Sequence, residues 1–169
     1  MHKTKRASPG RTPASERSSA QKAARARGLG ITRRGDLGEV AFVHKAMSLG
    51  YVVAKPYGQM HRYDFMVEGG NRIWRVQVKT STTVRDGKYQ LCVQRITHRR
   101  VVAYKKSEVD FVVAYLMPEK IWYILPVSEV TKRRSLLLTP PNFPRKDPFA
   151  KYREAWHLLG KPPGRAWPE

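Results

Sequence analysis

A hairpin pattern near the middle of the chain constrains the fold most. Residues 63–67 and 73–80 are two β-type runs, and Glu68-Gly69-Gly70-Asn71 lies between them. Glycine and asparagine accept the positive φ angles of a tight hairpin turn, so the two runs are expected to pair antiparallel. The sequence therefore predicts two adjacent antiparallel strands in the core of the fold.

The second of these strands, WRVQVKT, alternates apolar and polar residues from Trp74 onward. Alternate side chains point to opposite faces of a strand, so Arg75, Gln77 and Lys79 share one face. The hairpin brings Asp64 of the first strand close to Gln77 and Lys79. A carboxylate, an amide oxygen and an ammonium group are therefore expected to converge.

Other segments surround this hairpin. Asp36 is a candidate N-cap, and Glu39 follows at the spacing of a capping box, so a helix is expected from Asp36 to Leu49, before Gly50. We also expect strands over 51–54, 89–96, 109–116 and 121–125, a short helix capped by Ser128, and a final helix from Asp147 to Leu159, closed by Gly160. The order of a helix, a strand meander and further strands predicts an α/β (α+β) fold.

Charge divides the chain and indicates its partner. Residues 1–35 contain ten Lys or Arg and one acid, so we expect a disordered basic arm, followed by a domain over 36–160 and a flexible tail over 161–169. The formal net charge of +20 favours a polyanion, and DNA is the first candidate. No apolar run fits a membrane span or a secretory signal, so no membrane partner is expected. We expect a cytoplasmic protein, associated with the nucleoid if the cell is prokaryotic.

The converging polar groups suggest metal chemistry. Glu39 on the helix would add a second carboxylate to Asp64, and Mg²⁺ prefers such oxygen ligands. The metal would polarise a scissile phosphate and activate water, while Lys79 would orient that water or stabilise developing charge. Each residue also has a plainer explanation, because Glu39 fits a capping box, Asp64 can lie on an exposed edge strand, and Lys79 is ordinary on a half-exposed strand.

These motifs resemble the PD-(D/E)XK nuclease superfamily. Gly38-Glu39, Tyr63-Asp64-Phe65 and Val76-Gln77-Val78-Lys79-Thr80 are most similar to its branch of group I intron-associated homing endonucleases, in which glutamine replaces the second motif carboxylate. The resemblance implies a restriction-endonuclease-like fold, which is a small mixed sheet flanked by helices, and Mg²⁺ or Mn²⁺ as cofactor. It also implies that Glu39 and Asp64 are metal ligands, that Gln77 takes the third acidic position, that Val78 lends its carbonyl, and that Lys79 is the catalytic lysine.

Basic side chains around these strands are candidate contacts to DNA phosphates, which position a duplex without reading its sequence. They are Arg62, Arg75, Arg85, Lys88, Arg95, Arg99, Arg100, Lys105 and Lys106. His44 and His61 are not expected to bind metal. Asp110 is expected to pair with a basic neighbour in a structural role.

The leading hypothesis is a metal-dependent DNA endonuclease that acts through Glu39, Asp64, Gln77 and Lys79. A 19.4 kDa chain is small for cutting both strands of a duplex, so a homodimer or homotetramer is expected. Two alternatives stay open. One is a nucleic-acid-binding module that has lost catalysis, because glutamine removes one negative charge from the site. The other is a Holliday-junction resolvase-like nuclease, because such enzymes share the glutamate, aspartate and lysine pattern.

Overall fold

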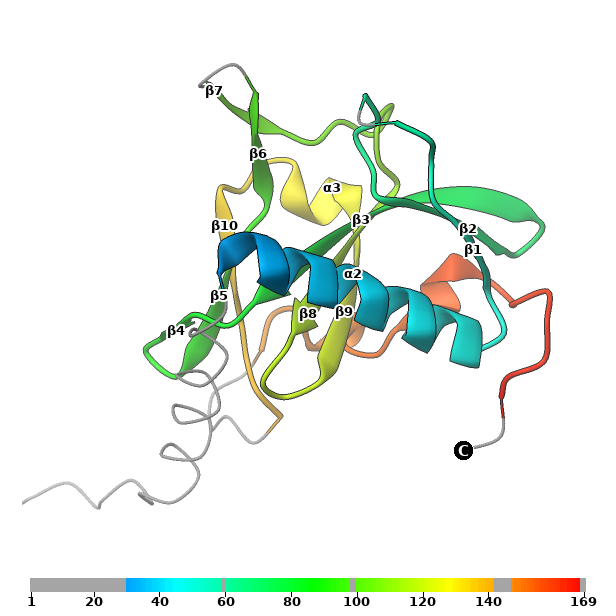
Figure 1. The fold of residues 1–169 in the computed structure, drawn as a ribbon. Coiled ribbons are helices and arrows are strands. Elements are labelled where there is room, and N and C mark those ends of the chain that lie inside the picture. The colour runs from blue at the N-terminus through cyan, green and yellow to red at the C-terminus, as the bar shows by residue number, and fades with distance from the viewer. Residues whose placement is uncertain (1–29, 59, 98–99, 142–146, 168–169) are drawn as a thin grey trace, which may run out of the picture.

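The chain folds around a five-stranded mixed sheet, shown for the computed structural model in Figure 1. The structure describes residues 30–58, 60–97, 100–141 and 147–167. The strand order is β1-β2-β3-β8-β9; β3 and β8 are parallel, and the other neighbours are antiparallel. This confirms the predicted mixed sheet. Its strands are β1 (Val52–Ala54), β2 (Phe65–Gly69), β3 (Arg72–Ser81), β8 (Phe111–Leu116) and β9 (Ile121–Pro126).

The turn between β2 and β3 sets the register of the hairpin. Gly69 pairs with Arg72, which leaves Gly70 and Asn71 as a two-residue loop. Both loop residues have φ of 61°. Positive φ at both positions matches a type I′ turn, whose twist suits the flanking strands. The predicted hairpin is confirmed.

Val76 lies at the point where three strands are aligned. It pairs with Phe65, the first residue of β2, and with Phe111, the first residue of β8. Each phenylalanine follows an aspartate, Asp64 in one case and Asp110 in the other. The two aspartates therefore stand on opposite sides of β3, just before the neighbouring strands begin.

Helix α2 spans Ile31–Ser48 and begins five residues before the predicted N-cap. Asp36 thus lies within the helix, and the capping-box prediction for Asp36 and Glu39 is wrong. A tertiary contact accounts for the earlier start, because the Arg34 guanidinium donates a hydrogen bond of 3.0 Å to Thr82 Oγ1 and fastens the first turns to the end of β3. Glu39 therefore does not cap the helix. It lies in the middle of α2 and is half-buried.

Helix α2 covers one face of the five-stranded sheet (Figure 1). Phe42 and Ala46 are fully buried and pack against Phe65, Val76 and Val78. This apolar face of β3 is the one predicted from the alternation in WRVQVKT. The polar side chains of Gln77 and Lys79 therefore lie on the other face of the sheet.

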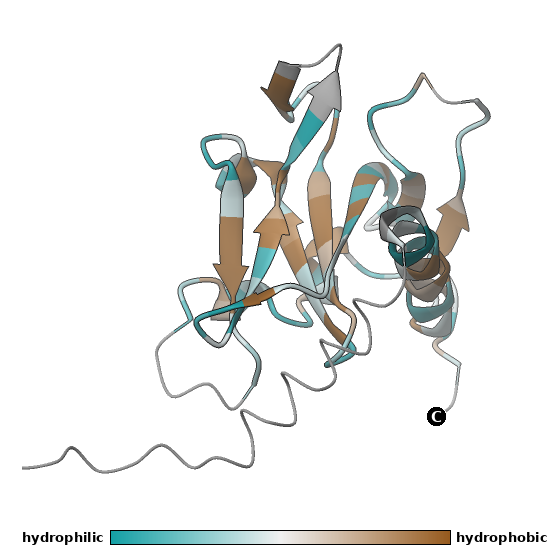
Figure 2. Cartoon of the chain, turned by 60° about the vertical axis from the view of Figure 1, so that its left-hand side comes forward, coloured by the Kyte–Doolittle hydropathy of each residue, from teal (hydrophilic) through white to brown (hydrophobic). Residues whose placement is uncertain are grey.

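The opposite face of the sheet packs against short strands and a short helix, which include β5, α3 and β10. Figure 2 shows that the strands are mainly hydrophobic and the connecting loops mainly hydrophilic. The predicted strand over 89–96 is two strands. The first, β5, ends at Cys92 and belongs to a three-stranded sheet with β4 and β10, and the second, β6, pairs with β7 in a separate hairpin. Pro126, not Ser128, occupies the N-cap of α3, and no side chain caps it. The elements are β4 (Val84–Arg85), β5 (Lys88–Cys92), β6 (Gln94–Thr97), β7 (Arg100–Ala103), α3 (Val127–Val130) and β10 (Ser135–Leu138).

The predicted C-terminal helix is wrong in type. The structure has two 3₁₀ turns, Ala150–Tyr152 and Trp156–Leu159. Between them Glu154 has φ of 49°, and its carboxylate accepts hydrogen bonds from the Trp122 backbone N–H (2.8 Å) and from the Trp156 indole N–H (2.9 Å). These tertiary bonds hold the chain out of helical geometry. The apolar spacing still identified buried side chains, because Phe149, Tyr152, Trp156 and Leu159 are all in the core.

The segment after Gly160 runs beside the end of α2. The Gly164 N–H donates to the Gly50 carbonyl (3.0 Å), and the Trp167 N–H donates to the Ser48 carbonyl (2.7 Å). Residues 161–167 of the predicted tail thus make backbone hydrogen bonds to the end of α2 and the turn after it, and residues 168–169 lie outside the described residues. Within the described part of the chain, none of the helices has the length and apolar character needed to cross a membrane. Residues 1–29 of the predicted basic arm lie outside the described residues. Residues 31–35 form the first turn of α2, so the prediction of disorder is wrong for them.

Candidate active site

The register of the hairpin brings Asp64 beside Gln77. The Asp64 backbone N–H donates to the Val76 carbonyl (2.9 Å), which extends the ladder one residue beyond β2. The Asp64 carboxylate then accepts a hydrogen bond of 2.8 Å from the Val78 N–H and a second bond from the Gln77 amide nitrogen. Asp64 is thus held at the open end of the β2–β3 hairpin, opposite the Gly70-Asn71 turn, and this end is called the hairpin mouth below. Asp64 is not an exposed residue of an edge strand.

Lys79 lies two residues after Gln77 on the same face of β3. Its ammonium nitrogen lies 5.8 Å from the ring centre of Tyr104, a residue that is 2 % exposed. The positive charge of Lys79 acts to lower the pKa of Asp64, so the two groups interact electrostatically. The predicted convergence of carboxylate, amide and ammonium is therefore present in the structure.

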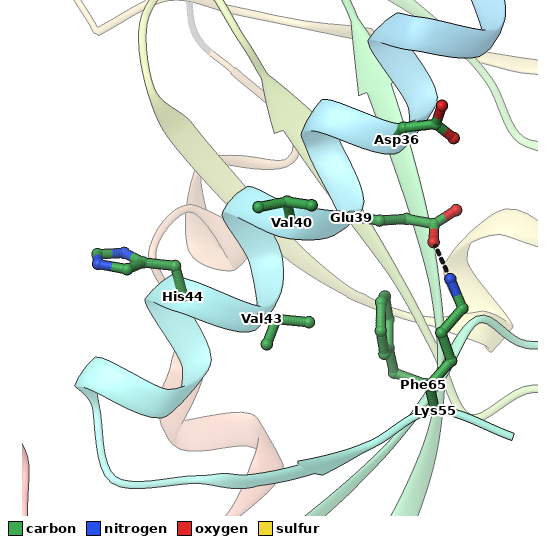
Figure 3. Close-up of a pocket in the computed structure, with 7 residues that line it drawn as sticks. All are labelled: Asp36, Glu39, Val40, Val43, His44, Lys55 and Phe65. Atoms are coloured by element: carbon green, nitrogen blue, oxygen red, sulfur yellow. Dashed lines mark hydrogen bonds and ion pairs between the residues drawn. The ribbon is translucent and has the colours of Figure 1, made fainter.

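Glu39 reaches the same region from α2. Gly38 makes this possible, because a Cβ built at that position would lie 1.8 Å from Thr80 Oγ1, so only glycine lets the helix approach β3 this closely. The Glu39 carboxylate accepts a hydrogen bond of 2.9 Å from the Lys55 ammonium (Figure 3). Its negative charge raises the pKa of Asp64, so the two carboxylates repel each other.

The pKa of Asp64 is raised above its ordinary value. Burial is the main cause, and the charge of Glu39 adds to it. The Val78 N–H, Lys79 and Gln77 act in the opposite direction without cancelling the effect. Burial disfavours the charged form of the Asp64 carboxylate. A further cation beside it would therefore stabilise the ionised form.

The donor set fits a hard divalent metal ion, which the PD-(D/E)XK nucleases generally use. Oxygens of Asp64 and Val78 converge on one donor, since the Gln77 amide nitrogen contacts the Asp64 carboxylate and lies 3.3 Å from the Val78 carbonyl. A 180° rotation of the amide would present its oxygen in place of its nitrogen. Glu39 would complete an all-oxygen set. In the described residues no three His, Cys, Asp or Glu side chains form a metal cluster, and this donor set includes an amide and a backbone carbonyl, which are outside those four residue types.

The predicted phosphate contacts fall into separate places. Arg62 lies in the loop between β1 and β2, and Lys105 and Lys106 follow β7; all three are exposed. That loop and the β6–β7 hairpin project from the same side of the molecule in Figures 1 and 2. Arg85 and Lys88 lie instead in the β4–β5 hairpin, toward another corner of the fold (Figure 1).

The remaining basic candidates are used differently or are not described. The Arg75 guanidinium binds Asp110 through two bonds of 3.0 Å and also donates to the carbonyls of Ser107 and Lys106, so its donors are engaged within the protein. This confirms the structural pairing predicted for Asp110. Arg95 lies 3.4 Å from Glu108, Arg100 is in β7, and Arg99 lies outside the described residues.

Two residues near the site were missed by sequence reasoning. Lys55 follows β1 and contacts Glu39, and Tyr104 packs beside Lys79. A lysine in a polar loop and a tyrosine after a short strand carry no distinctive spacing, so only the fold reveals them. A surface groove lies between α2 and the start of β2, and both Glu39 and His44 line it, but the His44 ring points away from the Glu39 carboxylate (Figure 3). His61 packs on Tyr63, with ring centres 5.4 Å apart.

The sheet, the helix glutamate and the aspartate and lysine at the hairpin mouth define a restriction-endonuclease-like nuclease fold. The family model described as PD-(D/E)XK endonuclease matches residues 31–159, so the chain belongs to the PD-(D/E)XK endonuclease family. It is also similar to the solved structure of the bacterial homing endonuclease I-Ssp6803I, with 29 % identity and a TM-score of 0.68 over 78 % of this chain and 93 % of that chain. These findings confirm the homing-endonuclease-like branch. Comparison with curated proteins gives no match.

Proposed function

We propose that the chain is a metal-dependent endonuclease that hydrolyses phosphodiester bonds of DNA, with Mg²⁺ or Mn²⁺ as cofactor. The observation that supports this most is that one Gln77 amide nitrogen contacts both the Asp64 carboxylate and the Val78 carbonyl, while Lys79 lies two residues further along the same face of β3. Membership of an endonuclease family and the likeness to a homing endonuclease agree with it.

Each residue of the site has a distinct task in this proposal. Asp64 and Glu39 would hold the metal, together with the amide oxygen of Gln77 and the Val78 carbonyl. Such an ion polarises the phosphate and lowers the pKa of a bound water. Lys79 would place its ammonium against the water or the developing phosphate charge.

DNA is the proposed substrate because of charge and shape. The chain carries a net charge of +20, and exposed Arg62, Lys105 and Lys106 lie on segments near the protruding loop and hairpin. Phosphate contacts from these side chains would place a backbone across the hairpin mouth. Cutting both strands is simplest with two active sites, so we propose a homodimer or homotetramer acting on DNA in the cytoplasm or nucleoid.

A cleavage assay tests the proposal. The protein would be incubated with linear duplex, single-stranded and four-way DNA, each with Mg²⁺, Mn²⁺ or EDTA. Lys79→Met should abolish metal-dependent cutting, whereas Lys161→Met should cut like wild type, because Lys161 is exposed beside the Gly70 turn at the other end of β2. Preference for four-way DNA would indicate a junction-resolving nuclease.

A non-catalytic binding module is the second candidate. It is favoured by the fact that both carboxylates already have donors from the protein itself, Gln77 for Asp64 and Lys55 for Glu39. Such a protein would bind all three DNAs in a mobility-shift assay and cut none of them with either metal. That result would contradict the enzymatic proposal.

A further inference from the structure

Lys55 occupies a place that sequence reasoning did not assign. It follows β1, and its side chain is 67 % exposed, while its ammonium nitrogen lies 2.9 Å from a Glu39 carboxylate oxygen. The same nitrogen lies 5.6 Å from the ring centre of Phe65. Figure 3 shows Lys55 reaching across the end of an open groove toward the helix. One of the two candidate metal-binding carboxylates therefore already has a cation bound to it.

Positive side chains offset most of the negative charge around the hairpin mouth. Glu39, Asp64 and Asp36 contribute three negative charges, and Lys55 and Lys79 contribute two positive charges. Gln77 is neutral, so it supplies none of the charge that a carboxylate would give at the same position. A divalent cation that approaches Glu39 meets an ammonium in the way and gains less net attraction than two carboxylates alone would provide.

We propose that Lys55 is a displaceable counter-ion of Glu39, which a divalent metal must remove before it can use that carboxylate. The inference rests on the proposed function, because it requires metal binding at Glu39 and Asp64. Displacement is feasible since Lys55 is largely exposed on a flexible four-carbon chain and its ion pair is close to water. The released ammonium lies beside the site, where a DNA phosphate can bind it.

The proposal makes metal binding depend on DNA. In the free protein, Lys55 competes with the metal for Glu39 and lowers metal affinity. When DNA is present, its phosphate offers Lys55 another anion, so Glu39 becomes available. By linkage, DNA should tighten metal binding, and metal should tighten DNA binding by the same factor.

The test measures metal binding directly, without cleavage. Free Mn²⁺ would be quantified by electron paramagnetic resonance during titration of wild type, Lys55→Met, Glu39→Gln and the double variant. Lys161→Met is the matched control, since it removes one exposed lysine charge far from the site. Circular dichroism would confirm that each variant is folded.

Lys55→Met should bind Mn²⁺ about two- to fivefold more tightly than wild type, the fold-change that a surface ion pair is worth. The gain should largely disappear in the Glu39→Gln background, and Lys161→Met should not show it. An uncleavable phosphorothioate duplex should tighten Mn²⁺ binding more for wild type than for Lys55→Met.

Three results would overturn the proposal. Unchanged or weaker Mn²⁺ binding by Lys55→Met, with a normal loss in Glu39→Gln, would reject the counter-ion role and leave the proposed function intact. If Lys55→Met raises Mn²⁺ affinity equally in the Glu39→Gln background, Lys55 acts by long-range charge repulsion of the metal and not by pairing with Glu39. Absence of Mn²⁺ binding in every protein, with DNA or without it, would reject both the metal site and the role of Lys55.

Discussion

Two aspartates on opposite sides of β3 show how one register produces two different sites. Asp64 precedes Phe65 at the start of β2, and Asp110 precedes Phe111 at the start of β8. Both phenylalanines pair with Val76. Because β2 is antiparallel to β3 and β8 is parallel to it, the two aspartates are directed to different ends of the shared strand.

The partners at those ends differ in charge. Asp110 meets Arg75, which binds its carboxylate through the backbone N–H at 2.8 Å and through the guanidinium. Burial alone would raise the pKa of Asp110, but the bonds and charge of Arg75 lower it overall. Asp64 meets the neutral amide of Gln77, and its pKa stays raised. One aspartate is a satisfied structural ion pair, and the other still gains from a cation.

The largest expected effect tests the Asp64 side of this comparison between the two aspartates. Asp64→Asn should reduce metal-dependent cleavage by roughly 10²–10³-fold, because it removes a carboxylate from the reacting centre. Its midpoint of urea unfolding without metal should be unchanged or higher, since a buried carboxylate with a raised pKa costs stability when ionised. Glu68→Gln, an exposed acid on the same strand, should match wild type in both measurements.

Loss of stability in Asp64→Asn would show instead that Asp64 holds the hairpin together, as Asp110 holds β3 to β8. Retention of full cleavage would remove Asp64 from the proposed mechanism.

The next effect concerns the contact that positions Glu39. Gly38→Ala places a Cβ against Thr80 Oγ1, so we expect a loss of about 1–3 kcal/mol in unfolding free energy and reduced cleavage. Gly35→Ala in the same helix meets nothing within 4 Å and should be neutral or stabilising. Adding Thr80→Ala to Gly38→Ala removes the nearest atom and should restore part of both losses. No rescue would mean that the helix is held elsewhere.

A smaller effect is expected on the other side of β3. Asp110→Asn weakens the bonds to Arg75 and should lower the free energy of unfolding by about 1.5 kcal/mol, the lower end of the range for hydrogen bonds to a charged group, because the pair is partly exposed. Cleavage per folded molecule should stay near the wild-type rate under conditions where both proteins are folded. A large drop in cleavage with normal stability would show that Arg75 and Asp110 act on DNA.

The smallest effect is a pH dependence. Because the folded-state pKa of Asp110 is lowered, its stabilising contribution is present above its unfolded pKa of about 3.8 and is lost as pH falls through the lower, folded value. The stability difference between wild type and Asp110→Asn should therefore be full near pH 6 and shrink toward pH 3 in urea titrations. A raised pKa acts with the opposite sign, so the gain from Asp64→Asn should be largest near neutral pH.

Patterns of short range predicted much of the fold and of the site. Alternation in WRVQVKT and the Gly-Asn turn fixed the hairpin, and the hairpin placed Asp64 beside Gln77. These features depend on neighbouring strands of one hairpin, whose contacts follow from local spacing. The structural role of Asp110 was also predicted, because a carboxylate at the start of a buried strand requires a partner.

Features that depend on distant contacts were not predictable. Arg34 extends α2 by bonding Thr82, and Glu154 replaces an expected helix by bonding Trp122 and Trp156. Neither partner can be identified from local propensity. Lys55 was missed for the same reason, since its contact with Glu39 joins a loop to a helix 16 positions away.

The Gly70-Asn71 turn limits how the length of this chain can vary. It lies at the far end of β2 from Asp64 and has no chemical role, so it looks like a loop that tolerates insertion. One inserted residue that shifted the pairing by one would instead put a valine opposite Asp64 and turn the amide toward the helix. A single extra residue in this remote turn that shifted the register would therefore separate the amide from Asp64 without changing either residue.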